Sequence, residues 1–262
     1  MQLVKFCKPE HNIHRGAKLK IGTLHGYRAI ENPELRDEAE GKYEFTIDFP
    51  EEIELDRRWT NLLLQSAMAF GNTDDVPRFP GTFSAYVEKL HFVRQTATSV
   101  VLKDTTVKIN RGVNDCLVFC MSLLKNVEAK LFEQYEDHWA FPEDKANTFA
   151  MRLANLIMNQ AKLADFDDSI SASHSPNSIK NLILNVRHRK VIYRERHLVI
   201  TEQNRPSYEE LIETLLNIPF IKPPEPFSKE EEYRFVFELQ DEQRIFPPKN
   251  PILLTLNPLI EL

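Results

Sequence analysis

Residues 227–237, FSKEEEYRFVF, are the stretch of sequence that decides the fold. Three consecutive glutamates lead into aromatic and aliphatic residues, which predicts a core strand over 230–239. Successive side chains of a strand point to opposite faces, so Glu230 and Glu232 are expected on the same face. Carboxylates that share a face repel each other and are costly to desolvate. One explanation is a site where the pair stabilises a developing positive charge, such as an oxocarbenium ion. The alternative is that the glutamates are solvated at the start of the strand.

The composition is that of a globular protein. The chain has 262 residues, 42% of them hydrophobic and 27% charged, which is ample for one large domain or two small ones. There are 17 Phe and only 7 Gly, so the core is expected to be aromatic, and neither of the two common glycine-rich phosphate motifs occurs. The net charge of −6 gives no overall attraction to nucleic acid or anionic membranes.

The sequence predicts a cytoplasmic protein. No apolar run approaches the roughly 20 residues that span a bilayer. The first residues, MQLVKFCKPEHN, lack the apolar segment of a signal peptide. Three cysteines, an odd number, fit a reducing compartment better than a disulfide framework.

Short elements follow one another without a repeating strand–helix unit. Strands are expected, besides 230–239, at 2–7, 18–24, 43–49, 82–93, 98–109, 116–123, 190–193, 197–201 and 252–256. Helices are expected at 57–70, at 143–164 and after a capping box at Ser207 and Glu210. The proline-rich segment 218–227 is expected to be a non-helical connector. Strands outnumber helices and do not alternate with them, so the predicted class is α+β.

Two candidate sites have simple structural interpretations. Cys116 and Cys120 lie four residues apart in an apolar strand, which suits core cysteines, whereas zinc needs four ligands at compact spacings. No metal site is therefore expected. His174 lies in a serine-rich loop without the G-x-S-x-G turn of a serine hydrolase, and a solvated loop histidine is the simpler interpretation.

Two charged segments are candidates for phosphate binding. The basic run 187–197 contains five Arg or Lys, two His and Tyr193, so it either grips nucleic acid or forms a strand with a basic outer face. The segment 27–41 is dense in charge and is either a solvated loop or a dinucleotide-binding loop. In the second case Arg28 forks onto phosphate and the ring of Tyr27 stacks on a base.

Several motifs occur in a fixed order along the chain. The first group is a short strand at 3–7, a turn with Gly16, and a strand at 20–24 that leads into Tyr27, Arg28 and the acidic segment 37–41. The second group is a central strand at 117–122 that ends in Ser122, and a stretch at 131–135 that keeps a Tyr. The last group is a K-V-x-Y strand at 190–193 and a closing pattern of Lys222, Phe227 and E-x-E-Y-R. In this order they resemble a widespread, poorly characterised bacterial family related to the ADP-ribosyltransferases.

The resemblance covers residues 3–41, 117–141 and 190–237, and it implies a fold and an activity. The implied fold is a split antiparallel sheet flanked by helices, in a single domain over 1–262 with residues 42–112 as an insertion. The implied activity is transfer of ADP-ribose from NAD to a macromolecular acceptor, either protein or nucleic acid. A toxin or phage-defence effector of this kind is expected to have a neutralising partner protein.

The resemblance also assigns roles to the closing strand. Glu232 is the catalytic carboxylate, which holds the nicotinamide ribose and stabilises the oxocarbenium ion, and Glu230 is its helper. Arg234 is two residues from Glu232 on a strand, so it shares that face and is expected to pair with Glu232 and keep it ionised.

The remaining binding residues come from earlier segments. The resemblance implies that Ser122 supports the site, and it makes Tyr27 and Tyr135 candidates for packing on nicotinamide or adenine. Lys5 stands where the superfamily has an Arg or His that grips NAD, and a lysine lacks the bidentate fork of arginine. Two alternatives therefore stay open: a catalytically inactive domain of the same fold that binds a nucleotide or a partner, and an RNA-binding module that uses the basic strand 187–197.

Overall fold

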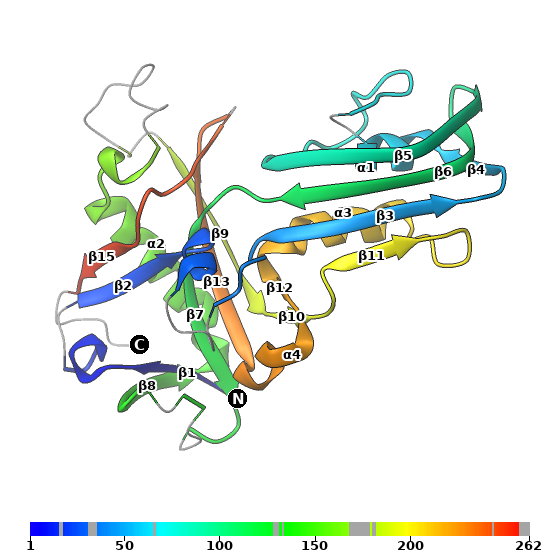
Figure 1. Ribbon diagram of the computed structural model, residues 1–262. Helices are drawn as coiled ribbons and strands as arrows, with labels where there is room; N and C mark the ends of the chain where they lie inside the picture. The colour runs from blue at the N-terminus through cyan, green and yellow to red at the C-terminus, as the bar shows by residue number, and fades with distance from the viewer. Residues whose placement is uncertain are drawn as a thin grey trace. The chain divides into compact units, whose positions relative to one another are not determined.

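The computed structural model describes residues 1–15, 18–30, 36–64, 67–127, 131–132, 134–167, 179, 182–242 and 244–256. Of these residues 43% lie in strands and 25% in helices, distributed over several sheets, which confirms the α+β class (Figure 1). The chain divides into two compact units, the first made of Met1–Glu40, Asp115–Tyr193 and Lys222–Leu262 and the second of Gly41–Asn114 and Arg194–Ile221. The expected insertion, 42–112, lies within the second unit.

An eight-stranded antiparallel sheet forms the first unit (Figure 1). Five strands follow one another in the order β14-β13-β7-β1-β8, β9 pairs with β13, and β2 pairs with both β7 and β15. Their bounds are β1 (Gln2–Cys7), β2 (Lys18–Thr23), β7 (Leu117–Leu124), β8 (Asp137–Pro142), β9 (Ile183–Lys190), β13 (Glu232–Gln240), β14 (Ile245–Phe246) and β15 (Ile252–Thr255).

The sheet opens along one edge of β7. On its other edge β7 pairs continuously with β13, from Leu117 opposite Phe237 to Ser122 opposite Glu232. On the open edge, β2 pairs with β7 no further than Val118, and β1 begins to pair only at Ser122. None of the strands that the structure describes therefore pairs with residues 119–121 on that edge, and the backbone carbonyl of Cys120 is accessible to side chains.

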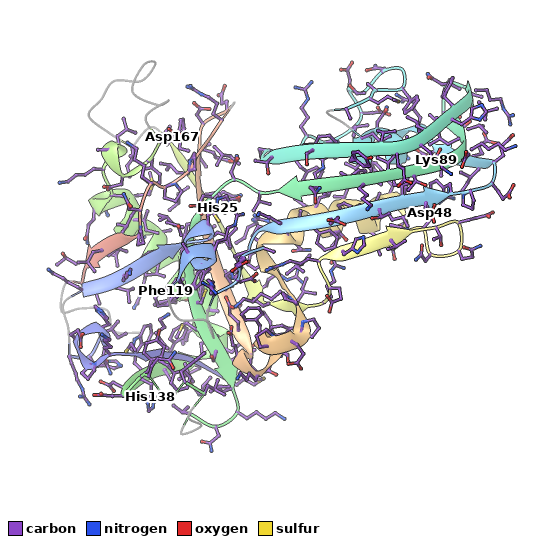
Figure 2. The ribbon with its side chains drawn as sticks, viewed as in Figure 1. His25, Asp48, Lys89, Phe119, His138 and Asp167 are labelled. Carbon is purple, nitrogen blue, oxygen red and sulfur yellow. The ribbon has the colours of Figure 1, made fainter. Side chains whose placement is uncertain are left out.

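Helix α2 (Ala146–Gln160) covers one face of this sheet and completes an aromatic core. Phe149 of α2 lies 5.7 Å from Phe119 and 5.3 Å from Phe235, between ring centroids, and Trp139 lies 5.8 Å away. Figure 2 labels Phe119, which projects from β7 into this cluster. Because side chains alternate along β7 and β13, the residues between these rings, including Cys120 and Arg234, face the other side of the sheet.

The second unit is a five-stranded sheet with two helices. Its strands are β3 (Lys42–Phe49), β4 (Ile53–Asp56), β5 (Thr82–Gln95), β6 (Ser99–Gly112) and β11 (His197–Ile200), in the order β11-β3-β6-β4 with β5 on β6. Its helices are α1 (Arg57–Leu64) and α3 (Tyr208–Asn217). Ser207 accepts a hydrogen bond from the backbone N–H of Glu210, and the Glu210 side chain accepts one from Ser207, as the capping box predicts. Asp48 of β3 and Lys89 of β5 mark this unit in Figure 2.

Several expected elements are wrong in extent or kind. Strands β4, β8 and β9 were not expected, the helix expected at 57–70 is described as Arg57–Leu64, and the strand expected at 230–239 begins at Glu232. The proline-rich connector contains helical turns at Ile218–Phe220 and Pro224–Phe227, because proline is tolerated in the first turn of a helix. A further 3₁₀ turn, Ser228–Glu230, follows the connector.

The remaining short elements are 3₁₀ turns at Pro9–His11, His25–Ala29, Glu143–Lys145 and Leu163–Asp165, and strands β10 (Ile192–Tyr193) and β12 (Ile221–Lys222). Gly16, His174 and the serine-rich loop lie outside the described residues. Among the helices that the structure describes, none is both long and apolar enough to cross a bilayer.

Candidate functional site

The three consecutive glutamates form a tight turn at the start of β13. Glu230 ends a 3₁₀ turn, Glu231 adopts a left-handed conformation with φ of 45°, and Glu232 is the first residue of the strand. The two outer carboxylates therefore share one side because of this turn, and the predicted strand alternation between them is wrong. Glu231 points elsewhere, since its half-exposed carboxylate pairs with Lys190.

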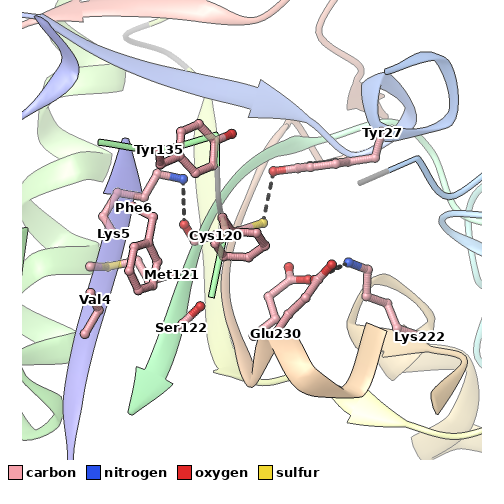
Figure 3. A pocket seen from close by; sticks show the side chains of 12 residues that line it. Val4, Lys5, Phe6, Tyr27, Cys120, Met121, Ser122, Tyr135, Lys222 and Glu230 are labelled. Atoms are coloured by element: carbon pink, nitrogen blue, oxygen red, sulfur yellow. Dashed lines mark hydrogen bonds and ion pairs between the residues drawn. The ribbon is translucent and has the colours of Figure 1, made fainter. Parts of the chain in front are cut away.

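Glu230 and Glu232 are joined by one buried lysine. The Nζ of Lys222 lies 2.9 Å from Glu230 Oε2 and 2.8 Å from Glu232 Oε2 (Figure 3). The ammonium also lies 4.4 Å from the ring centroid of Phe227. Only 8% of Glu230 and 3% of Lys222 is exposed, so these charges are held in a medium of low polarity.

Arg234 links Glu232 to a third carboxylate. Its Nε donates to Glu232 Oε1 at 2.8 Å, which is the expected pairing on one strand face. Its two terminal nitrogens donate to the two oxygens of Glu40, at 3.0 and 3.2 Å. Arg234 and Glu40 are both 0% exposed, so this bidentate pair is fully buried.

This arrangement gives the two site carboxylates different proton affinities. Burial acts to raise the pKa of Glu232, but Arg234 and Lys222 outweigh burial and hold that pKa well below its usual range. Burial raises the pKa of Glu230 to about 7, with Lys222 opposing the shift and Glu232 adding to it. Glu232 is thus a fixed negative charge, and Glu230 is able to exchange a proton near neutral pH.

Lys5 occupies the opening in the sheet. Its Nζ donates to the backbone carbonyl of Cys120 at 2.8 Å (Figure 3). The Nζ also lies 4.7 Å from the ring centroid of Phe119. The ammonium therefore satisfies a carbonyl that has no strand partner on this edge. Burial lowers the pKa of Lys5, with the nearby Cys120 and Glu232 opposing the shift.

A small cavity of about 90 Å³ brings the predicted site together. Its lining residues, drawn in Figure 3, come from segments far apart in the sequence: Val4, Lys5, Phe6, Tyr27, Cys120, Met121, Ser122, Phe132, Tyr135, Lys222, Glu230 and Glu232. Lys5, Ser122 and Glu232, which come from the three anchors of the resemblance, thus share one cavity with both tyrosines.

Tyr27 and Cys120 form a hydrogen-bonded chain toward the catalytic candidate. The Tyr27 hydroxyl donates to Cys120 Sγ at 3.2 Å, and the Cys120 thiol is hydrogen-bonded to Glu232. Burial raises the pKa of Cys120 to about 12, with Glu232 adding to the shift, so the thiol stays protonated and acts as a donor. On the other side of Glu232, its backbone N–H donates to the Tyr193 hydroxyl at 2.8 Å.

A larger cavity of about 440 Å³ adjoins the first. Both are lined by Lys5, Phe6, Tyr27, Cys120 and Tyr135, so they are two lobes of one cleft at the opening between β1 and β2. We call them the carboxylate lobe and the basic lobe, because the described lining of the larger one contains Lys5, Lys8, His11 and Lys20 and no Asp or Glu.

The basic residues predicted to bind phosphate outside the cleft make contacts within the protein instead. Arg28 lines neither lobe; its Nε donates to the backbone carbonyl of Glu40 at 2.8 Å, so it braces the loop that carries Glu40. In the basic run, Arg187 pairs with Glu238 and Lys190 with Glu231. These basic side chains are therefore engaged within the protein.

The sequence interpretation gave no role to Glu40, and it named Lys222 only as part of a motif. No local pattern reveals Glu40, which lies 194 residues from its partner Arg234. One signal in the sequence pointed to such a partner. A buried arginine carries five N–H donors, and a single carboxylate cannot accept hydrogen bonds from all of them, so a second acidic residue beside Arg234 was to be expected.

The described residues contain no group of three or more His, Cys, Asp or Glu that could hold a metal ion. Cys7, Cys116 and Cys120 are free thiols.

Comparisons with protein-family models, curated proteins and solved structures find no match for this chain. The function therefore has to be argued from the geometry of the cleft.

Proposed function

We propose that this protein is an ADP-ribosyltransferase-like enzyme that transfers ADP-ribose from NAD to a macromolecular acceptor. The observation that carries the proposal is the meeting of a carboxylate lobe and a basic lobe at an opening in an antiparallel sheet. An opening of this kind supports the split sheet that the resemblance implies.

The two lobes complement the two ends of NAD. The nicotinamide riboside end carries a positive charge, which Glu232 and the ionised form of Glu230 attract. The diphosphate is negative and fits Lys5, which lies at the junction of the two lobes, and Tyr27 and Tyr135 offer rings there. The basic lobe, of about 440 Å³, is within the usual range of ligand sites.

The chemistry requires no metal. The bond between ribose C1′ and the nicotinamide nitrogen breaks, and its electron pair leaves with neutral nicotinamide. The oxocarbenium ion that remains is stabilised by the fixed charge of Glu232, which is preorganised by Lys222 and Arg234. An oxygen or nitrogen of the acceptor then bonds to C1′, and Glu230 takes the proton that the acceptor releases.

Labelled NAD, incubated with the protein and a cell lysate, tests this proposal. Transfer of label that disappears in Glu232→Gln supports it, and nuclease treatment tells a nucleic-acid acceptor from a protein acceptor. Glu231→Gln is the matched control, because this neighbouring glutamate lies outside both lobes and should keep activity. No binding of NAD and no release of nicotinamide would overturn the proposal. A growth assay on induced expression tests toxicity with the same two variants.

One observation favours a catalytically inactive domain as the second candidate. Both oxygens of Glu232 are engaged, Oε1 by Arg234 and Oε2 by Lys222, and these cations offset its charge. Binding of NAD without release of nicotinamide is the result that this alternative expects. If the protein is instead an RNA-binding module, its affinity for RNA should not change when NAD is added and should fall steeply as the salt concentration rises.

A further inference from the structure

The basic lobe has more positive charge than the diphosphate of NAD requires. Lys5 lies at the junction, and Lys8, His11 and Lys20 line the rest of the lobe. No carboxylate lines this lobe among the residues that the structure describes. This concentration of cations contrasts with a chain whose net charge is −6.

The cations beyond the junction are available to a ligand. Lys8 and Lys20 are exposed and form no ion pair with the described residues. The Nδ1 of His11 is buried and has no hydrogen-bond partner within the described part of the chain. An anion that bound here would therefore supply partners that the protein itself does not.

The kind of side chain near a nucleotide ribose indicates whether that ribose is phosphorylated. In doubly wound dinucleotide-binding folds, for example, an Asp or Glu accepts a hydrogen bond from the free 2′-hydroxyl of the adenosine ribose, whereas an Arg accommodates a 2′-phosphate at the same position. The same electrostatic reasoning applies to lysines and histidines in other folds. The basic lobe has the second character, with three lysines and a histidine and no described acid.

We infer that the basic lobe binds a nucleotide with a phosphate monoester on its adenosine ribose, in addition to the diphosphate. This inference rests on the proposed function, since the other end of the same ligand reaches Glu230 and Glu232. A 2′-phosphate, as in NADP, and a 3′-phosphate are the two sources of this chemistry.

Titration calorimetry with NAD and NADP at equal ionic strength tests the inference. NADP should bind about tenfold more tightly or better, because a phosphate monoester gains charge-assisted contacts, and added salt should narrow the difference. AMP, 2′,5′-ADP and 3′,5′-ADP then identify the position of the monoester, since the two bisphosphates differ from AMP only by that group. NAD binding as tightly as NADP, with no gain for either bisphosphate over AMP, would overturn the inference and leave the proposed function intact. If neither dinucleotide binds, both fail.

Single lysine variants locate the phosphate. Lys8→Ala and Lys20→Ala should each weaken NADP binding severalfold and leave NAD binding nearly unchanged, so the preference for NADP shrinks. Lys18→Ala is the matched control, since Lys18 is an exposed lysine on the same strand β2 that lines neither lobe. All three side chains are exposed, and circular dichroism should show unchanged folding. An equal effect of Lys18→Ala and Lys20→Ala on NADP binding would contradict a site in the basic lobe.

Discussion

Replacing Arg234 by methionine should strongly destabilise the first unit. Arg234 is fully buried and neutralises Glu40, also fully buried, through two hydrogen bonds of 3.0 and 3.2 Å. It also contacts Glu232, but Lys222 still neutralises that carboxylate when the guanidinium is removed. The substitution therefore leaves mainly the buried charge of Glu40 without its cation. Removing one partner of a buried ion pair lowers the free energy of unfolding by about 3–5 kcal/mol.

Urea unfolding followed by tryptophan fluorescence measures this cost. The chain has two tryptophans, Trp59 in the second unit and Trp139 in the first, so a Trp59→Phe background reports on the first unit alone. With a urea dependence of about 1–3 kcal/mol per M, a cost of about 3–5 kcal/mol should lower the midpoint by roughly 1–5 M. Glu231→Gln, which breaks only the half-exposed pair with Lys190, should change the free energy of unfolding by less than about 1 kcal/mol.

A double variant and a pH series decide whether uncompensated charge is the cause. Adding Glu40→Gln to Arg234→Met removes the orphaned charge, so the double variant should be more stable than the single one. The lowered pKa of Glu232 contributes stability above its unfolded value near 4.5, and this contribution is lost as the pH falls. Arg234 supplies part of it, so the difference between wild type and Arg234→Met should shrink below pH 4.5. A cost under about 1 kcal/mol, or a double variant less stable than Arg234→Met, would refute this reasoning.

Three further predictions use other parts of the structure. Because the pKa of Glu230 is about 7, release of nicotinamide should rise as the pH passes 7. The folded state also binds this proton more tightly than the unfolded state, so wild type should lose stability relative to Glu230→Gln as the pH rises from 4.5 to 7. Assays over pH 5–9 check the first and melting curves the second; a flat activity profile in wild type would contradict the assignment. Phe149→Ala should cost about 3–5 kcal/mol by urea unfolding, since Phe149 contacts four aromatic rings of the core. Ser207→Ala should cost about 1 kcal/mol in the second unit, measured by the fluorescence of Trp59 in a Trp139→Phe background.

The sequence predicted elements whose stability is local or depends on burial of one face. Strand β2 alternates polar and apolar residues, β7 is an apolar run, and the capping box at Ser207 is complete within four residues. Strand β9 was missed because no residue in it is fully buried and its basic side chains hide the pattern. Its stability comes from cross-strand partners such as Glu238, which pairs with Arg187, and no local window contains both.

The candidate site was predicted where its chemistry is local and missed where it is not. Glu232 and Arg234 lie two residues apart on a strand, so their pairing follows from alternation alone. Glu230 was placed beside Glu232 for the wrong reason, because the left-handed residue Glu231 creates the geometry. The position of Glu40 beside Arg234 was missed, because only the tertiary fold brings these two residues together.

The buried charges of the site form a network whose sum depends on one proton. Glu40, Glu230 and Glu232 supply three negative charges when ionised, and Lys222 and Arg234 supply two positive charges. The network is therefore neutral when Glu230 is protonated and carries one net negative charge when Glu230 is ionised. All five groups are held by mutual hydrogen bonds and ion pairs, so they cannot reorient to screen a cation beside them. It follows that attraction for a positively charged ribose should depend on the ionisation of Glu230, while Glu232 and its partners hold the geometry in which that charge acts.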